Sequence, residues 1–119
     1  PTPEPVEVPA GSRLDGWAAS PGRYDGTAHV VHDPADSIPH GAVLVAQATD
    51  ASWSPLFVDA GAIVLERGGP LSHAAILARE LGVPAVLNVP GATTVLDGAT
   101  VTVDGDLGVV VVHDHEPVP

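Results

Sequence analysis

One histidine of the chain has neighbours suited to carrying a phosphoryl group. His73 follows Ser72, and the residues after it have the composition of a short helix that ends at Gly82. Serine commonly caps helix N-termini, so His73 is predicted at the first helical position. The first N–H groups of a helix have no internal partner, and the helix dipole favours negative charge at that end. Because a neutral imidazole is a nucleophile, we predict that His73 is a phosphohistidine site.

Residues around His73 are candidates for supporting the phosphoryl group. A glycine pair precedes the Ser-His pair, and glycine allows backbone conformations closed to other residues while leaving room for a partner's nucleotide or substrate. Two of the four basic residues each lie six positions from His73, which suggests local charge compensation for phosphate; the alternative is a pair of solvated arginines. The phosphate-supporting candidates are therefore Arg67, Gly68, Gly69, Ser72 and Arg79.

The residues flanking His73 form a longer pattern. It reads Gly68-Gly69-x-x-Ser72-His73-Ala74-Ala75-Ile76-x-Ala78-Arg79-Glu80-Leu81-Gly82-Val83-Pro84-Ala85-Val86. This pattern resembles the mobile, or swivelling, domain of PEP-utilising enzymes, a family that includes pyruvate phosphate dikinase, phosphoenolpyruvate synthase, enzyme I of the sugar phosphotransferase system and rifampicin phosphotransferase. The resemblance covers roughly residues 11–113. One departure is Leu71, immediately before the Ser-His pair, where many members have a threonine; a hydroxyl able to contact the phosphoryl group is therefore missing.

The resemblance implies a fold and a reaction. The fold would be a swivelling domain of the α/β class, with β/β/α layers and mixed sheets. His73 would take a phosphoryl group on Nε2 from an ATP-grasp nucleotide-binding domain, or from PEP, and pass it to a substrate domain such as a PEP/pyruvate barrel. These partner domains would belong to the same parent chain and would hold the Mg²⁺ and the ATP or PEP. The domain itself would bind no cofactor.

Composition narrows the function classes. The 119 residues carry a formal net charge of −11, so the surface should repel nucleic acid. The chain has no lysine and no phosphate-binding Gly-x-x-x-x-Gly-Lys-Ser/Thr motif, so we do not expect it to bind ATP alone. No apolar run approaches the roughly 20 residues of a membrane span. The absence of cysteine suits a reducing compartment, and we expect a cytoplasmic protein.

A metal site is not expected. His29 and His32 would lie on opposite faces of a strand, and His113 and His115 would be two residues apart on a tail. No cysteine supports either pair as metal ligands.

Hydrophobic patterning predicts short strands interleaved with two or three short helices. Several strand-like runs are apolar throughout, which indicates strands covered on both faces. The Ser54-Pro55 pair predicts the start of a first helix, which ends by Gly61. Apolar residues at positions 74, 77, 78 and 81 predict the buried face of a second helix. Asp97-Gly98 and Asp104-Gly105 predict turns, the latter within a hairpin. The predicted strands are residues 27–31, 42–48, 62–65, 85–87, 100–103 and 107–112.

The chain is predicted to contain one domain with a segment on each side. Residues 1–10 contain four prolines and are interpreted as a linker, residues 11–113 as the phosphohistidine domain and residues 114–119 as a tail. The favoured function is a phosphocarrier domain of a multidomain phosphotransferase, catalytically incomplete on its own. The alternatives are a carrier domain of an enzyme I-like protein phosphorelay and a catalytically silent swivelling domain that serves interaction.

Overall fold

The central strands of the fold are covered on both faces. The computed structural model describes residues 11–115, in which β4 (Val43–Ala46), β5 (Ala62–Leu65) and β6 (Ala85–Leu87) are buried at every position. Alternate side chains point to opposite sides of a strand, so each of the three strands contributes to two separate hydrophobic cores. This burial on both faces explains why these strands are apolar at every position in the sequence.

The strands form one mixed sheet of eight members in the order β1-β8-β7-β3-β4-β5-β6-β2. Strand β3 (Arg23–Val30) is the junction, because it pairs in parallel with β4 and antiparallel with β7. Strands β4, β5 and β6 continue in parallel, and β2 closes that edge antiparallel to β6. The remaining strands are β1 (Arg13–Asp15), β2 (Trp17–Ser20), β7 (Ala99–Asp104) and β8 (Val109–His115).

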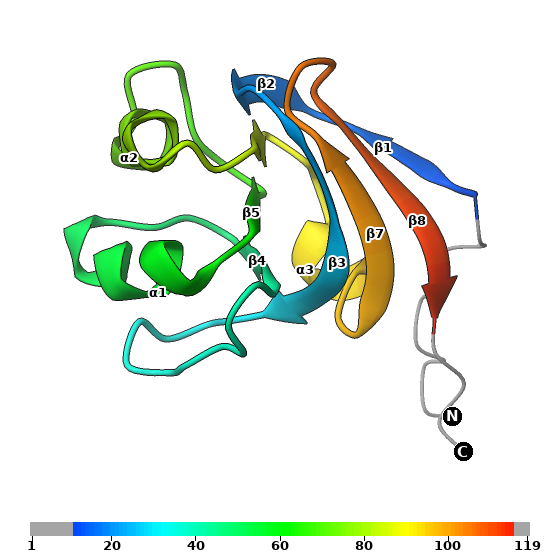
Figure 1. The fold of residues 1–119 in the computed structure, drawn as a ribbon, viewed down its shortest axis with the longest axis horizontal. Coiled ribbons are helices and arrows are strands. Elements are labelled where there is room, and N and C mark those ends of the chain that lie inside the picture. Colours follow the sequence, from blue (N-terminus) through cyan, green and yellow to red (C-terminus); the bar gives the residue numbers. More distant parts are fainter. Residues whose placement is uncertain (1–10, 116–119) are drawn as a thin grey trace.

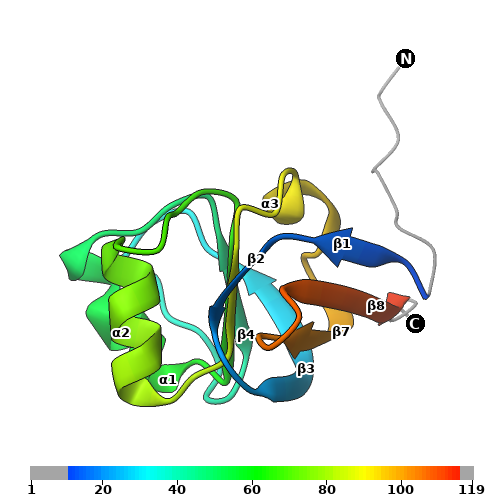
Figure 2. The same ribbon diagram turned by 90° about the horizontal axis from the view of Figure 1, so that it is seen from above.

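The molecule has three layers. Helices α1 (Ser54–Asp59) and α2 (His73–Leu81) lie on one side of the parallel strands, and β1, β7 and β8 lie on the other side (Figures 1 and 2). The short 3₁₀ helix η1 (Ala51–Trp53) leads into α1, and α3 (Ala92–Val95) packs with the second core. Leu44, Ile63 and Leu87 face the helices, whereas Val43, Val64 and Val86 face the antiparallel strands. The β/β/α layering predicted from the resemblance is confirmed.

Several predictions from the sequence agree with the structure at the level of single residues. Strands β5 and β6 have the predicted bounds, the Asp104-Gly105 turn joins β7 to β8, and α1 ends before Gly61. Other predictions are wrong. Strand β3 begins at Arg23 rather than at residue 27, and β8 continues through residues 114 and 115, which were assigned to the tail. The cause is pairing: β3 and β8 are both extended by their partner β7.

Three elements were not predicted by the hydrophobic pattern. Strands β1 and β2 have few buried positions and form by pairing with β8 and β6, which are distant in sequence. Helix α3 has only four residues and no side-chain cap. The buried face of α2 consists of Ala74, Ala75 and Ala78, with Leu77 partly buried and Leu81 40% exposed, so position 81 does not belong to the buried stripe.

The predicted linker, residues 1–10, and the last residues of the predicted tail lie outside the described residues. Within the described part of the chain, no helix is long and apolar enough to cross a membrane.

One polar contact fixes α3 to the end of β5. The Glu66 carboxylate accepts hydrogen bonds from the Thr93 hydroxyl, 2.5 Å away, and from the Thr93 amide, 2.9 Å away. These two bonds, with smaller Coulombic contributions from Arg67 and His32, lower the pKa of Glu66 from its ordinary value.

We predict that Thr93→Val raises the pKa of Glu66 toward its ordinary value, because the hydroxyl donor is lost. A carboxyl whose pKa is lowered in the folded state contributes stability above its unfolded pKa, and that contribution is lost as the pH falls through the folded value. The variant should therefore lose less stability than the parent between neutral and acidic pH. Carboxyl ¹³C NMR titration of Glu66 gives the pKa. Thr94→Val, at an exposed neighbouring position, is the control; equal titration of Glu66 in both variants would contradict the assignment.

Candidate functional site

His73 is the first residue of α2, as predicted. Ser72 is the N-cap: its backbone is extended and its hydroxyl oxygen accepts a hydrogen bond from the Ala75 amide at 3.3 Å. Gly82 ends the helix in the left-handed conformation, with φ of 71°. The helix start therefore fixes the backbone of His73 with its side chain at the end of the helix.

The two nitrogens of the His73 ring have different environments. Nδ1 is buried and has no hydrogen-bond partner among the described residues. Nε2 is not among the buried unpartnered atoms and makes no hydrogen bond to a described residue, so it is not fully buried. The ring lies against Phe57 of α1, with ring centroids 5.9 Å apart and planes tilted by 55°. Packing on the buried Phe57 thus holds the imidazole with Nδ1 inward and Nε2 outward.

The segment between β4 and η1 was not among the predicted site residues, yet it contains Asp50, which interacts Coulombically with His73. The Thr49 hydroxyl oxygen is buried and, like Nδ1 of His73, has no partner among the described residues. Its neighbour Asp50 caps η1 by accepting from the Ser52 amide at 2.9 Å. The hydroxyl and amide of Ser52 lower the pKa of Asp50, and a Coulombic contribution from His73 lowers it further. The sequence signal for this segment was its position directly after a buried parallel strand.

The first turn of α2 presents backbone donors. The amides of His73 and Ala74 have no hydrogen-bond partner within residues 11–115. The donor of the Ser72 hydroxyl, by contrast, is already used, because it donates to the Gly69 carbonyl at 2.7 Å. Ser72 therefore holds the loop and the helix together, and the free donors at this end are the backbone amides.

The two glycines before the helix differ in backbone conformation and in the space available to a side chain. Gly68 has φ of 148°, and a Cβ there would come within 2.9 Å of the Leu87 side chain. Gly69 has no positive φ, and a Cβ there would meet nothing within 4 Å. The prediction of unusual backbone conformation therefore holds for Gly68, whereas Gly69 only leaves open space.

The structure does not bring the two candidate arginines together at His73. Arg79 turns back to β2: its Nε donates to the Ala19 carbonyl at 2.7 Å, and its guanidinium lies 5.8 Å from the Trp17 ring centroid. Another guanidinium nitrogen donates to the Pro70 carbonyl at 3.3 Å. Arg79 thus ties α2 to the sheet edge and to the loop before His73.

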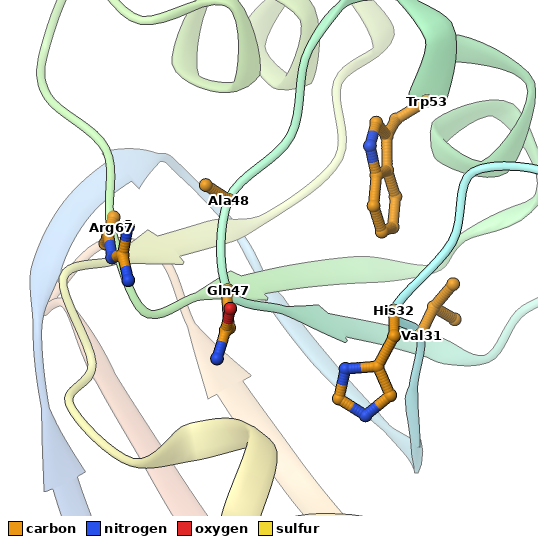
Figure 3. A pocket seen from close by; sticks show the side chains of 6 residues that line it. All are labelled: Val31, His32, Gln47, Ala48, Trp53 and Arg67. Carbon is orange, nitrogen blue, oxygen red and sulfur yellow. The ribbon is translucent and has the colours of Figure 1, made fainter.

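Arg67 lies at a separate hollow. It follows β5, and its side chain lines a pocket together with residues that follow β3 and β4 and with Trp53 of η1 (Figure 3). Arg67 therefore lies at the same edge of the sheet as the loop before His73. Among the described residues, it makes no hydrogen bond to the His73 imidazole.

No metal site is found in the part of the chain that the structure describes, where no three histidine, cysteine, aspartate or glutamate side chains gather. His29 is an exposed residue of β3 and His32 lies beyond the end of that strand. His113 belongs to β8 rather than to a tail, and its Nε2 lies 2.5 Å from the Thr102 hydroxyl.

Comparison with known proteins gives a family match over the segment that contains the site. Residues 38–108 match the mobile domain of PEP-utilising enzymes. The prodigiosin synthesizing transferase PigC of Serratia marcescens is 42% identical over 116 residues, which are 94% of this chain and 13% of that protein. A probable phosphoenolpyruvate synthase of Staphylothermus marinus is 49% identical over 100 residues, 80% of this chain and 12% of that protein.

A rifampicin phosphotransferase of a Streptomyces species is 43% identical over 106 residues, 87% of this chain and 12% of that protein. The chain thus spans about an eighth of the length of these curated relatives. It corresponds to one segment of much longer enzymes.

Solved structures share the fold. An enzyme I solution structure aligns with a TM-score of 0.57 and 31% identity, over 71% of this chain and 35% of that one. Aconitase X of Thermococcus kodakaraensis aligns with a TM-score of 0.65 over 87% of this chain and 100% of that one, at 20% identity. The latter likeness concerns the fold alone.

The two glycines give a matched test of the loop geometry. We predict that Gly68→Ala lowers the free energy of unfolding by about 1–3 kcal/mol, since it adds backbone strain and a contact with Leu87. Gly69→Ala should change it by less than about 0.5 kcal/mol, because its Cβ enters open space. Urea unfolding of both variants measures the difference. Equal destabilisation by the two substitutions would overturn this description of the loop.

Proposed function

This chain belongs to the family of mobile domains of PEP-utilising enzymes, and we propose that it is a phosphocarrier domain within a multidomain phosphotransferase. His73 receives a phosphoryl group from one partner domain and delivers it to another. The observation that carries this proposal is the orientation of the His73 ring, with Nδ1 buried and Nε2 not fully buried.

The reaction requires a lone pair on the nitrogen that faces the donor. With its proton on Nδ1, the neutral imidazole has that lone pair on Nε2. Nε2 attacks the phosphorus of the donor, the N–P bond forms, and the P–O bond to the leaving group breaks with its electron pair remaining on the departing oxygen. Delivery is the reverse: an acceptor oxygen attacks the phosphorus and the N–P bond electrons return to Nε2. The Nδ1 proton stays in place.

The helix start supports the phosphorylated form. A phosphoryl group on Nε2 brings negative charge to the N-terminal end of α2, where the dipole is positive and the amides of His73 and Ala74 lack partners among the described residues. The favourable interaction of a helix N-terminus with a charge is about 0.3–1 kcal/mol, and up to about 2 kcal/mol in partly buried sites. Gly69 leaves the approach to this helix end open.

The other reactants come from partner domains. The chain has no lysine and no phosphate-binding loop, so we assign ATP or PEP, with Mg²⁺, to an ATP-grasp nucleotide-binding domain and to a substrate domain in the parent chain. A partner that reaches Nε2 would also contact Leu71, which is 87% exposed, and Ile76 one turn along α2. We expect this transfer to take place in the cytoplasm.

A second candidate function is supported by the likeness to enzyme I. In an enzyme I-like relay, the acceptor is a small partner protein rather than a substrate held in the same chain. The two functions share the chemistry at His73 and differ in the acceptor, so the identity of the acceptor distinguishes them.

We predict that the chain gains a single phosphate when its nucleotide-binding partner domain and ATP or PEP are supplied, and none with ATP or PEP alone. His73→Asn should abolish the added mass while leaving the fold intact, because the amide is not a nucleophile. His29→Asn, at an exposed position of β3, is the control and should be phosphorylated like the parent. Intact-mass measurement before and after acid treatment gives the result. A phosphate that persists in His73→Asn, or that resists acid, would refute the proposal.

A further inference from the structure

A second hollow lies outside the His73 site, at the carboxyl ends of three neighbouring parallel strands. Its volume is about 130 Å³, and its lining residues follow β3, β4 and β5 or belong to η1 (Figure 3). Ligands of open α/β sheets bind at this edge, because the loops that leave the strands form crevices there. The lining residues are Val31, His32, Gln47, Ala48, Trp53 and Arg67.

The guanidinium at this pocket has no direct side-chain partner among the described residues. The Arg67 guanidinium makes no hydrogen bond or ion pair within residues 11–115, whereas Arg13 pairs with Asp15 at 3.1 Å and Arg79 is held by backbone carbonyls. The adjacent Glu66 carboxylate is bound by Thr93 instead. In a chain with four basic and fifteen acidic side chains, a guanidinium at the edge of a pocket that makes no direct ion pair is available to an external anion.

The other lining residues can contact the hydrocarbon part of a small organic ligand, called its carbon body below. Val31 and Trp53 are almost fully buried and border the pocket with the small apolar surface that remains accessible, and the exposed Ala48 adds a methyl group. Gln47 and His32 add side chains able to form hydrogen bonds. One water molecule needs roughly 10–15 Å³ of such volume, so the pocket has room for a small organic molecule of several non-hydrogen atoms.

The local charge favours a monoanion over a dianion. Arg67 supplies one positive charge, and Glu66 lies within Coulombic range of both Arg67 and His32. A phosphate dianion would bring more negative charge than the single charge of Arg67 balances, in a chain whose net charge is already −11. A carboxylate matches the planar donor fork of one guanidinium.

We propose that this pocket binds a small organic monocarboxylate, with its carboxylate on Arg67 and its carbon body against Val31 and Trp53. The site is distinct from His73 and does not depend on phosphorylation. The proposal thus goes beyond the phosphocarrier function and is independent of it.

The test is a titration of the 119-residue chain with propionate, followed by ¹H–¹⁵N NMR. We expect millimolar affinity, with shifts of the Ala48 and Arg67 amides and of the Trp53 indole N–H. Propionamide, which has the same shape without the charge, should shift these signals little. Inorganic phosphate, which lacks the carbon body, should bind more weakly than propionate.

Two variants locate the site. Arg67→Gln should weaken propionate binding about tenfold or more, because a charge-assisted contact is lost. Ala48→Leu should weaken it by filling the pocket while leaving the charge unchanged. Arg23→Gln removes a charge from the exposed face of β3 and is the matched control; it should bind propionate like the parent.

His73→Asn should also bind propionate with unchanged affinity, so this test succeeds or fails separately from the phosphorylation experiment. Three results would overturn the proposal: no shift of the pocket signals, equal loss of binding in Arg23→Gln and Arg67→Gln, or phosphate binding as tightly as propionate.

Discussion

Burial of β4, β5 and β6 on both faces is the constraint on which the rest of the structure depends. Each strand alternates its side chains between a core shared with α1 and α2 and a core shared with β7 and β8. Fully burying one Val, Leu or Ile side chain contributes roughly 1.5–3 kcal/mol, so these three short strands hold both layers. Because β4 and β5 run in parallel, the segments that leave them lie along one edge of the sheet. The segment after β5 leads to His73, and the pocket of Arg67 lies at the same edge.

The His73 site combines tight control of the backbone with an open approach. Ser72 uses its hydroxyl for both the helix cap and the loop carbonyl, Gly68 allows the loop to pass Leu87, and Phe57 orients the ring. Arg79 ties the same loop to β2. These contacts leave Nε2 and the first helix amides free, which is the arrangement a carrier needs if two partners are to reach the same atom in turn.

Much of this arrangement could be predicted from local sequence, because caps, turns and apolar runs act over a few residues. The Ser72 cap, the Gly82 stop and the bounds of β5 and β6 are examples. Features that depend on distant partners could not. Strand β2 exists through pairing with β6, and Arg79 takes its role from the carbonyl of Ala19, sixty positions away. Arg67 and His73 stand at opposite ends of the segment that joins β5 to α2, and the path of that segment over the sheet, which spacing in the sequence does not encode, sets where each lies.

The central claim is that packing fixes the His73 ring so that Nε2, and not Nδ1, is the atom that carries the phosphoryl group. Long-range ¹H–¹⁵N correlation spectra of the phosphorylated chain, labelled with ¹⁵N in histidine, identify the nitrogen that is coupled to phosphorus. This account predicts phosphorus on Nε2 of His73 and a retained proton on Nδ1. Phosphorus on Nδ1, or on another histidine, would contradict it.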